Sequence, residues 1–138
     1  MDCPFCTINE EKTRIISEGT YTRVILSNPR LMPGHLLIVP KRHVERISEL
    51  EENEKRELFE KLEEFQEKIL SKLAKGCDIR QNFRPFQKQN NLKVHHLHIH
   101  LQPRELEDDL YKKCQIFETQ VFSELTNEEK EKFSKLFS

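Results

Sequence analysis

The sequence lacks a long run of apolar residues, an excess of charge of one sign, and an apolar or basic segment at its start. No apolar run approaches the roughly 18 residues that a membrane-spanning helix needs, so the sequence predicts no membrane partner. The 23 Lys and Arg residues nearly cancel the 24 Asp and Glu residues, so no bulk charge attracts a nucleic-acid duplex. An anionic ligand must therefore be held by a local group of residues.

The first residues, Met1-Asp2-Cys3-Pro4, contain no export signal, which predicts a cytoplasmic protein. In that reducing compartment a close pair of cysteines more often binds a metal than forms a disulfide. Cys77 and Cys114 stand singly in helical or apolar patterns and are predicted to be small core residues. The length of 138 residues indicates one domain, which can bury roughly two-thirds of the surface that its unfolded chain exposes.

Strand-forming and helix-forming patterns along the chain predict an α+β fold with an antiparallel sheet. Residues 21–26 and the apolar residues 36–39 predict two strands, which the turn-forming residues between them place side by side. From residue 48 to residue 75, apolar side chains recur every three or four positions and predict one long helix packed on the sheet. The pattern after residue 104 is again helical and predicts two helices, with Thr126 as an N-cap and Glu129 as its capping-box partner.

The most informative feature is the run from Val94 to Leu101, in which three histidines alternate with aliphatic residues. Side chains of an extended strand point to opposite faces in turn, so the three imidazoles should share one face while the aliphatic residues enter the core. Residues 79–83 predict a strand that pairs with this run as a hairpin. A solvated polar face is the alternative, but such a face would rarely contain the same titratable residue three times. The histidines are His96, His98 and His100, and the aliphatic residues are Leu97, Ile99 and Leu101.

A row of imidazoles can act on a phosphate that lies over it. The central ring, His98, can attack phosphorus through Nε2 when it is neutral and an acceptor holds its Nδ1 proton. The next ring, His100, can then stabilise charge on the phosphate oxygens. The alternative is that all three histidines bind a catalytic metal, as in a metal-dependent hydrolase.

Cys3 and Cys6 form a Cys-x-x-Cys pair, a spacing that lets two thiolates bind one tetrahedral zinc. A redox pair would normally follow a strand and open a helix, whereas only two residues precede Cys3. Two free cysteines at a frayed terminus are the alternative. The remaining ligands should be neutral imidazoles, and the candidates are His35, His43, His95 and His96, of which we favour His43 and His96.

These motifs resemble the histidine triad (HIT) superfamily of nucleotide hydrolases and transferases. The run from His96 to Leu101, followed by Pro103-Arg104, is similar to the family's signature of alternating histidines. The segment from Pro33 to His43 resembles its Pro-Gly-His loop and apolar strand, and Cys3-Pro4-Phe5-Cys6 resembles the opening of its zinc-containing members. The resemblance implies a catalytic domain with a zinc knuckle over residues 1–104 and a C-terminal helical extension of the same domain over residues 105–138.

The resemblance also assigns roles to individual histidines and cysteines. His98 matches the nucleophile that forms a covalent nucleotidyl-histidine intermediate. His100 matches the histidine that contacts the attacked phosphate. The implied ligands of a structural zinc are Cys3, Cys6, His43 and His96.

Other positions match the family's nucleotide-binding residues. Asn28, in competition with Ser27, matches the residue that holds the ribose, and Asn82 matches a phosphate-binding asparagine if the loop after it is a few residues longer. Lys93 stands where many members carry Ser or Thr near the leaving group, and a lysine there favours an anionic leaving group over an amine. Gln102 replaces the last apolar residue of the signature, and the family's glycine-rich stretch before the triad is missing.

The sequence therefore predicts a zinc-containing enzyme that cleaves at the α-phosphate of a nucleotide derivative, such as a dinucleoside polyphosphate, with water or phosphate as the acceptor. The expected partner is a small nucleotide substrate, and neither a nucleic-acid duplex nor a membrane is expected. The resemblance also implies a homodimer, although no feature of the sequence demands one. Two alternatives stay open: a module that binds nucleotide or zinc without catalysis, and the metal-dependent hydrolase.

Overall fold

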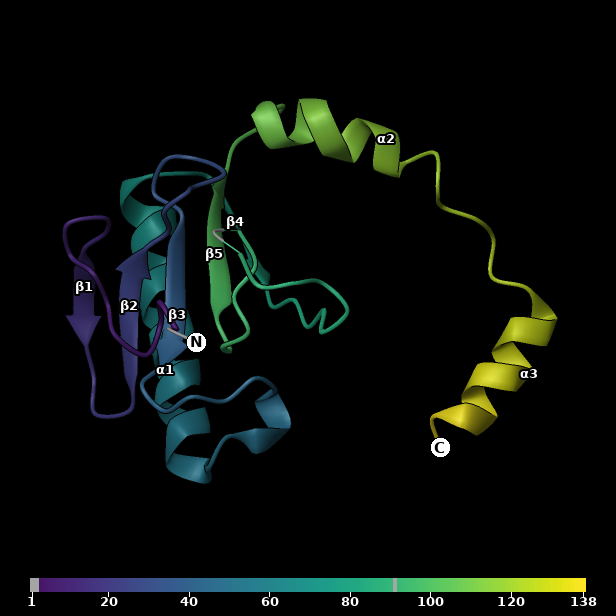
Figure 1. Ribbon diagram of the computed structural model, residues 1–138. Helices are drawn as coiled ribbons and strands as arrows, with labels where there is room; N and C mark the ends of the chain where they lie inside the picture. The colour runs from purple at the N-terminus through teal and green to yellow at the C-terminus, as the bar shows by residue number, and fades with distance from the viewer. Residues whose placement is uncertain (1–2, 91) are drawn as a thin grey trace. The chain divides into compact units, whose positions relative to one another are not determined.

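The computed structural model describes residues 3–90 and 92–138, so Met1, Asp2 and Asn91 lie outside the described residues. The chain divides into two compact units, Met1–Leu106 and Glu107–Ser138. The first unit contains all five strands and the longest helix (Figure 1). The second unit contains only helical segments and loops.

A five-stranded antiparallel sheet forms the centre of the first unit, in the order β1-β2-β3-β5-β4. This sheet and the helix packed on it confirm the predicted α+β fold. The strands β2 and β3 lie within one residue of the bounds expected from sequence. The bounds are β1 Ile15–Glu18, β2 Thr22–Leu26, β3 Leu36–Pro40, β4 Gly76–Arg80 and β5 Ile99–Arg104.

One strand was not predicted, and two others begin at different residues than predicted. β1 was not expected, because its four residues at the edge of the sheet are too few to show a clear alternation of side chains. β4 begins three residues before the expected position, at Gly76, and pairs with β5 as the predicted hairpin. β5 begins only at Ile99, because the segment before it binds the loop after β3 through single contacts, such as the bond from Leu97 N–H to the carbonyl of Val44.

The long helix α1, Glu52–Lys72, is shorter than expected and is preceded by a turn of 3-10 helix, η1, at Ile47–Glu49. It begins where the side chain of Glu54 accepts a hydrogen bond of 2.8 Å from the backbone N–H of Glu51, because this bond satisfies a backbone donor at the helix start. It ends before the loop that leads to Gly76, the first residue of β4.

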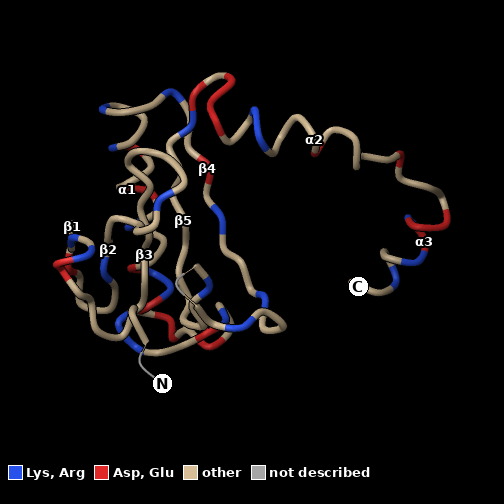
Figure 2. Tube along the Cα trace, turned by 45° about the horizontal axis from the view of Figure 1, so that its top comes forward, with Lys and Arg blue, Asp and Glu red and all other residues tan. Residues whose placement is uncertain are grey.

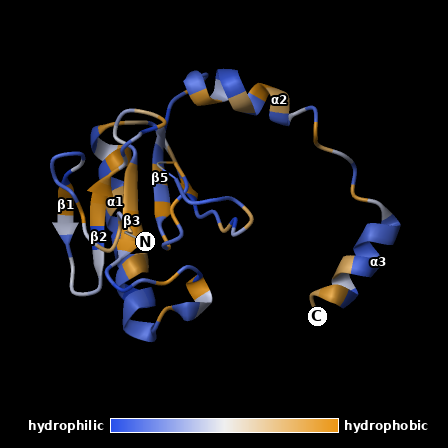
Figure 3. Ribbon diagram, viewed as in Figure 1, coloured by the Kyte–Doolittle hydropathy of each residue, from blue (hydrophilic) through white to orange (hydrophobic). Residues whose placement is uncertain are grey.

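The sheet has an apolar core on each face. On one face the α1 residues Leu58, Phe65 and Ile69 pack with Ile38 and Leu101 of the sheet, and α1 lies behind the strands in Figure 1. The other face carries a smaller cluster that the N-terminal segment covers. Figure 3 shows the apolar character of β2 and β3, which supply both clusters. The smaller cluster consists of Ile25, Leu37 and Val39 with Phe5, Ile8 and Ile15 packed against it.

The second unit confirms the helical character predicted for the tail. A π-helical turn, η2 at Tyr111–Gln115, leads into α2, Ile116–Glu118, and a loop then connects to α3, Asn127–Leu136. The Thr126 hydroxyl caps α3 by accepting the backbone N–H of Glu129 at 3.1 Å, as expected. Cys114 is exposed, so its prediction as a core residue is wrong, whereas Cys77 packs against the larger core.

None of the helices within residues 3–90 and 92–138 is both long enough and apolar enough to cross a lipid bilayer.

Candidate active site and metal centre

The three alternating histidines lie on the sheet face opposite α1. Only His100 belongs to β5; His96 lies in a bend before the strand, and His98 lies just before its first residue, Ile99. Their aliphatic neighbours are buried in the core that α1 covers, as the alternation predicts. The ring of Phe5 lies beside the rings of His96 and His98, with centroids 6.0 and 5.0 Å away. The buried neighbours are Leu97, Ile99 and Leu101.

His98 is held in one tautomer by its own backbone segment. Its Nδ1–H donates to the carbonyl oxygen of His96 at 2.7 Å, because a carbonyl can only accept. The second ring nitrogen, Nε2, therefore carries a lone pair. This is the form of imidazole that can attack phosphorus.

His100 is held by His35, a residue that the sequence suggested only as a possible metal ligand. The two residues reach each other because β3 and β5 are paired, with Leu37 opposite His100. Gly34 adopts a positive φ of 82°, which a residue with a side chain rarely adopts, and this turn places His35 at the start of β3. Nε2 of His35 lies 2.9 Å from Nδ1 of His100.

Burial keeps these imidazoles neutral. The pKa of His100 is lowered to about 3, first by burial and then by the positive charges of neighbouring groups, which include Arg80 and Lys93. The pKa of His35 is lowered to about 4, mainly by burial and to a lesser extent by His98. Burial is also the largest cause of the lowered pKa of His98. Near pH 7 the site therefore presents neutral rings with fixed donors and lone pairs.

The Cys-x-x-Cys pair meets the two favoured histidines at one point. The four ligand atoms of Cys3, Cys6, His43 and His96 all lie within 4.8 Å of one another. Nδ1 of His96 is 3.3 Å from Sγ of Cys3 and 3.5 Å from Sγ of Cys6. Nδ1 of His43 is 3.3 Å from Sγ of Cys6 and 3.2 Å from Nδ1 of His96.

These spacings match the edges of a small coordination tetrahedron. Zinc–sulfur bonds of about 2.3 Å and zinc–nitrogen bonds of about 2.0–2.1 Å give separations of about 3.3–3.6 Å for pairs that include a nitrogen and about 3.8 Å for the two sulfurs. His96 is 1% exposed, and its Nε2–H donates to the carbonyl of Pro40 at 2.8 Å, which directs the Nδ1 lone pair at the cysteines. The four residues could therefore hold one tetrahedral metal.

The other histidines do not join this cluster. His35 binds His100, and His95 binds the carbonyl of Gln87 through Nε2 at 2.8 Å. Within residues 3–90 and 92–138, the Cys3-Cys6-His43-His96 group is the only such cluster of metal-binding side chains. A catalytic metal bound by all three triad histidines is therefore not favoured, because His96 belongs to the cysteine cluster and His100 binds His35.

The sequence model of the HIT domain matches residues 9–107 of the chain. The chain belongs to the HIT domain family. The match begins after Cys3 and Cys6, so these two cysteines lie outside the matched residues. Among curated proteins no match is found.

Solved HIT structures have the same fold over most of the chain. A HIT family protein from Bacillus anthracis is 22% identical, over 98% of this chain and 94% of that chain, with a TM-score of 0.70. A Zn-bound histidine triad family protein from Mycobacterium smegmatis is 24% identical, over 78% of each chain, with a TM-score of 0.63. A HIT family hydrolase from Clostridium thermocellum is 25% identical, over 78% of this chain and 94% of that chain, with a TM-score of 0.58. The fold is thus that of a HIT hydrolase.

The residues expected to bind the nucleotide differ in burial, since Asn28 is exposed and Asn82 and Lys93 are half-buried. Asn28 is exposed in the loop between β2 and β3, where its side-chain amide donates to the carbonyl of Lys12 at 2.6 Å. Lys93 is half-buried in the loop that leads to the triad. Within residues 3–90 and 92–138, no hydrogen bond joins the side chain of Asn28 to His98 or His100.

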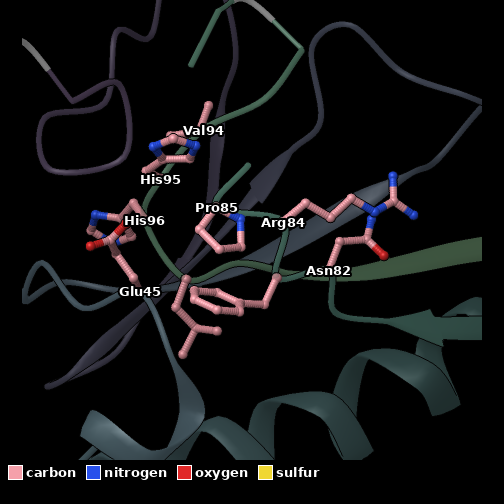
Figure 4. A pocket seen from close by; sticks show the side chains of 9 residues that line it. Glu45, Asn82, Arg84, Pro85, Val94, His95 and His96 are labelled. Atoms are coloured by element: carbon pink, nitrogen blue, oxygen red, sulfur yellow. The ribbon is translucent and has the colours of Figure 1, made fainter. Parts of the chain in front are cut away.

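Asn82 lines a small cavity beside the triad segment. Figure 4 shows its side chain next to that of Arg84, with Val94, His95 and His96 on another side of the cavity. The cavity holds about 30 Å³, which is room for one or two water molecules and too small for a nucleotide.

Sequence reasoning missed two residues of this HIT site. The sequence does point to His35, because a histidine that directly follows Pro33-Gly34 and precedes an apolar strand calls for an explanation. Phe5 lies between the two cysteines, and its ring connects the metal cluster to His98. Its apolar side chain had no chemical signal of its own.

Proposed function

We propose that this HIT protein cleaves the α-phosphate of a nucleotide derivative, such as a dinucleoside polyphosphate, through a covalent nucleotidyl-histidine on His98. The observation that carries the proposal is the fixed tautomer of His98, with Nδ1–H on the His96 carbonyl and a free lone pair on Nε2. His100 lies two residues further along the chain, and the centroids of the two rings are 5.0 Å apart. That spacing suits an attack on phosphorus by one ring and a contact with a phosphate oxygen by the other.

The proposed reaction has two steps. The lone pair of His98 Nε2 forms a bond to the α-phosphorus, and the bond from phosphorus to the bridging oxygen breaks, with its electron pair leaving on that oxygen. Water then attacks the same phosphorus and loses a proton to the solvent, while the nitrogen–phosphorus bond returns its electron pair to Nε2. Inorganic phosphate in place of water makes the same protein a nucleotidyl transferase.

His100 acts on the charge that develops at phosphorus. Because Nδ1 of His100 faces His35, its Nε2 can carry a proton and donate it to a non-bridging phosphate oxygen. A neutral donor held in place needs no reorganisation as the charge builds up. Asn28, Asn82 and Lys93 are the proposed contacts of the nucleotide around this centre.

We also propose that the Cys3-Cys6-His43-His96 cluster binds a structural zinc. The two thiolates and two imidazoles are ligands that zinc prefers, and their spacings fit a tetrahedron. A zinc with four protein ligands has no open position for substrate, so it would stabilise the fold and take no part in the reaction. It would tie the N-terminal segment, including Phe5, to the segment that carries His98.

Trapping of the intermediate tests the proposed function. The purified protein is mixed with diadenosine tetraphosphate and quenched in acid-free denaturant, and peptides are analysed by mass spectrometry for an adenylyl group on His98. His98→Asn should lose the adduct and lower turnover by at least about a thousandfold. His95→Asn is the matched control, because it removes a neighbouring imidazole whose ring binds the carbonyl of Gln87.

Other results of these measurements would support a different function for this protein. Binding without turnover in the wild type would indicate a non-catalytic module. Turnover that persists in His98→Asn would rule out the covalent mechanism. Loss of turnover on chelation, with the fold intact, would indicate a catalytic metal, whereas a structural zinc should take fold and turnover away together.

A further inference from the structure

Arg80 stands next to the proposed phosphate site on the edge strand. It lies directly opposite His100 in the pairing of β4 with β5, and residues opposite each other in an antiparallel pair point to the same face. Its side chain is exposed. Figure 2 shows basic residues on β4 and along the loop that follows it. Arg80 thus places a positive charge on the face of the sheet that carries His100.

No carboxylate neutralises Arg80 within residues 3–90 and 92–138. The nearest acid on the same face of its strand is Asp78, two residues earlier, which is opposite Gln102. Asp78 is already paired with Arg104 at 2.5 Å. The charge of Arg80 is therefore available to a ligand.

Lys93 brings a second such charge from the loop that leads to the triad. Its backbone is fixed in a turn, because Asn90 Oδ1 accepts its N–H at 3.0 Å and the Asn90 N–H donates to its carbonyl at 2.8 Å. The loop is fixed again by the bond from His95 N–H to Gln89 Oε1 at 2.9 Å. Lys93, like Arg80, makes no ion pair within the described chain. Three residues later the same segment reaches the first triad histidine.

The charges of both residues act on His100, where each contributes to its lowered pKa. Since that ring is neutral, it adds no net charge to attract an anion. The positive potential over this end of the face therefore comes from the guanidinium of Arg80 and the ammonium of Lys93. Chain-wide charge is close to balanced, so the attraction of an anion to this face depends on local charges such as these two.

We propose that Arg80 and Lys93 form an anion site for the leaving group, so that the enzyme prefers substrates whose leaving group is itself a phosphate or polyphosphate. This inference rests on the proposed function. When His98 displaces such a group, the bridging oxygen departs as a phosphate anion and requires no proton, and the two cations stabilise its charge. An amine leaving group must instead gain a proton and offers no charge for the cations to bind.

Two substrates with the same adenylyl part separate these cases: diadenosine tetraphosphate, which releases a polyphosphate, and adenosine 5′-phosphoramidate, which releases ammonia. Arg80→Gln and Lys93→Gln should each lower kcat/KM for the tetraphosphate by roughly tenfold, the value of one charged hydrogen bond, and change the phosphoramidate rate by less than about threefold. Arg80→Lys should keep most of the tetraphosphate activity. Arg56→Gln removes the same charge from an exposed site on α1 and is the matched control.

Binding of inorganic pyrophosphate, measured by calorimetry, is a second readout that needs no turnover. Its affinity should fall in Arg80→Gln and Lys93→Gln and should stay unchanged in Arg56→Gln. Equal effects on the two substrates, or unchanged pyrophosphate affinity, would overturn the anion site while the His98 adduct still forms. Absence of the adduct in the wild type would count against the proposed function, and pyrophosphate affinity would then still decide whether the two cations bind an anion.

Discussion

The Nε2 atom of His35 lies 2.9 Å from the Nδ1 atom of His100. The other nitrogen of His35, Nδ1, accepts a hydrogen bond of 3.1 Å from the backbone N–H of Leu31, so the proton of its neutral ring must be on Nε2. That proton is donated to His100 Nδ1, which forces the proton of neutral His100 onto its own Nε2. The backbone N–H of Leu31 thus sets the tautomer of His100 through the ring of His35.

His35 should therefore act as a positioning residue, and its replacement should be costly when the donor to His100 is lost. His35→Leu should lower kcat by about 10- to 100-fold, the usual cost of losing a partner that fixes an imidazole. His35→Gln should keep more activity, because its amide can place an N–H near the original Nε2. Nitrogen NMR shifts of the His100 ring should report a mixture of tautomers in His35→Leu. Equal kcat values in the two variants, with an unchanged tautomer, would show that His35 only fills space.

Local pattern was enough to predict the parts of the site that depend on one segment. The alternation of residues 96–101 predicted which side chains face the core, and burial of Leu97 and Leu101 bears this out. It did not predict where β5 begins, because the residues before Ile99 bond to the loop after β3 and to side chains in place of a strand ladder. Nδ1–H of His98 binds a backbone carbonyl, for example.

Contacts between distant segments were harder to predict, because no local pattern encodes the register between strands. His35 and His100 are 65 residues apart and meet only through the pairing of β3 with β5. Arg80 faces His100 through the pairing of β4 with β5. The metal cluster was predicted in spite of such distances, because the need for two thiolates and two imidazoles limits the choice of residues.

Removal of a metal ligand should weaken both metal binding and the fold. Cys3→Ser and His43→Ala should lower the zinc content of the purified protein from about one per chain and lower its melting temperature, because metal-binding energy contributes to folding. Cys114→Ser is the matched control, since Cys114 is exposed and lies outside the cluster. Elemental analysis and thermal unfolding measure both quantities. Full zinc content in either ligand variant would exclude this cluster as the site.

Acid should destabilise the protein through its buried neutral histidines. The pKa of His35 is about 4 in the folded chain and near 6.5 when unfolded. Between these values the unfolded state binds a proton that the folded state does not. The free energy of unfolding therefore rises with pH from about 4 to about 6.5 and loses this contribution as the pH falls, with a slope of up to about 1.4 kcal/mol per pH unit for one such group.

Comparison of two proteins isolates this effect from acid-driven metal release. His35→Gln lacks the titrating ring but keeps the Cys3-Cys6-His43-His96 cluster, so both proteins should lose metal alike. Denaturant unfolding at several values between pH 5 and pH 7.5 should give a shallower pH slope for the variant, by up to about one proton. Parallel slopes would mean that His35 titrates normally in the folded chain.

Gln102 is a buried polar residue whose replacement should stabilise the fold. It is 1% exposed in β5, and its side-chain carbonyl Oε1 has no hydrogen-bond partner within the described residues. A buried acceptor without a partner costs about 1–3 kcal/mol, and Met fills a similar volume without that acceptor. Gln102→Met should therefore raise the free energy of unfolding by about 1 kcal/mol, measured as a higher denaturant midpoint with an unchanged m-value. Gln120→Met at an exposed position should change it by less than about 0.5 kcal/mol, and a lower midpoint for Gln102→Met would show that the amide is satisfied in the folded protein.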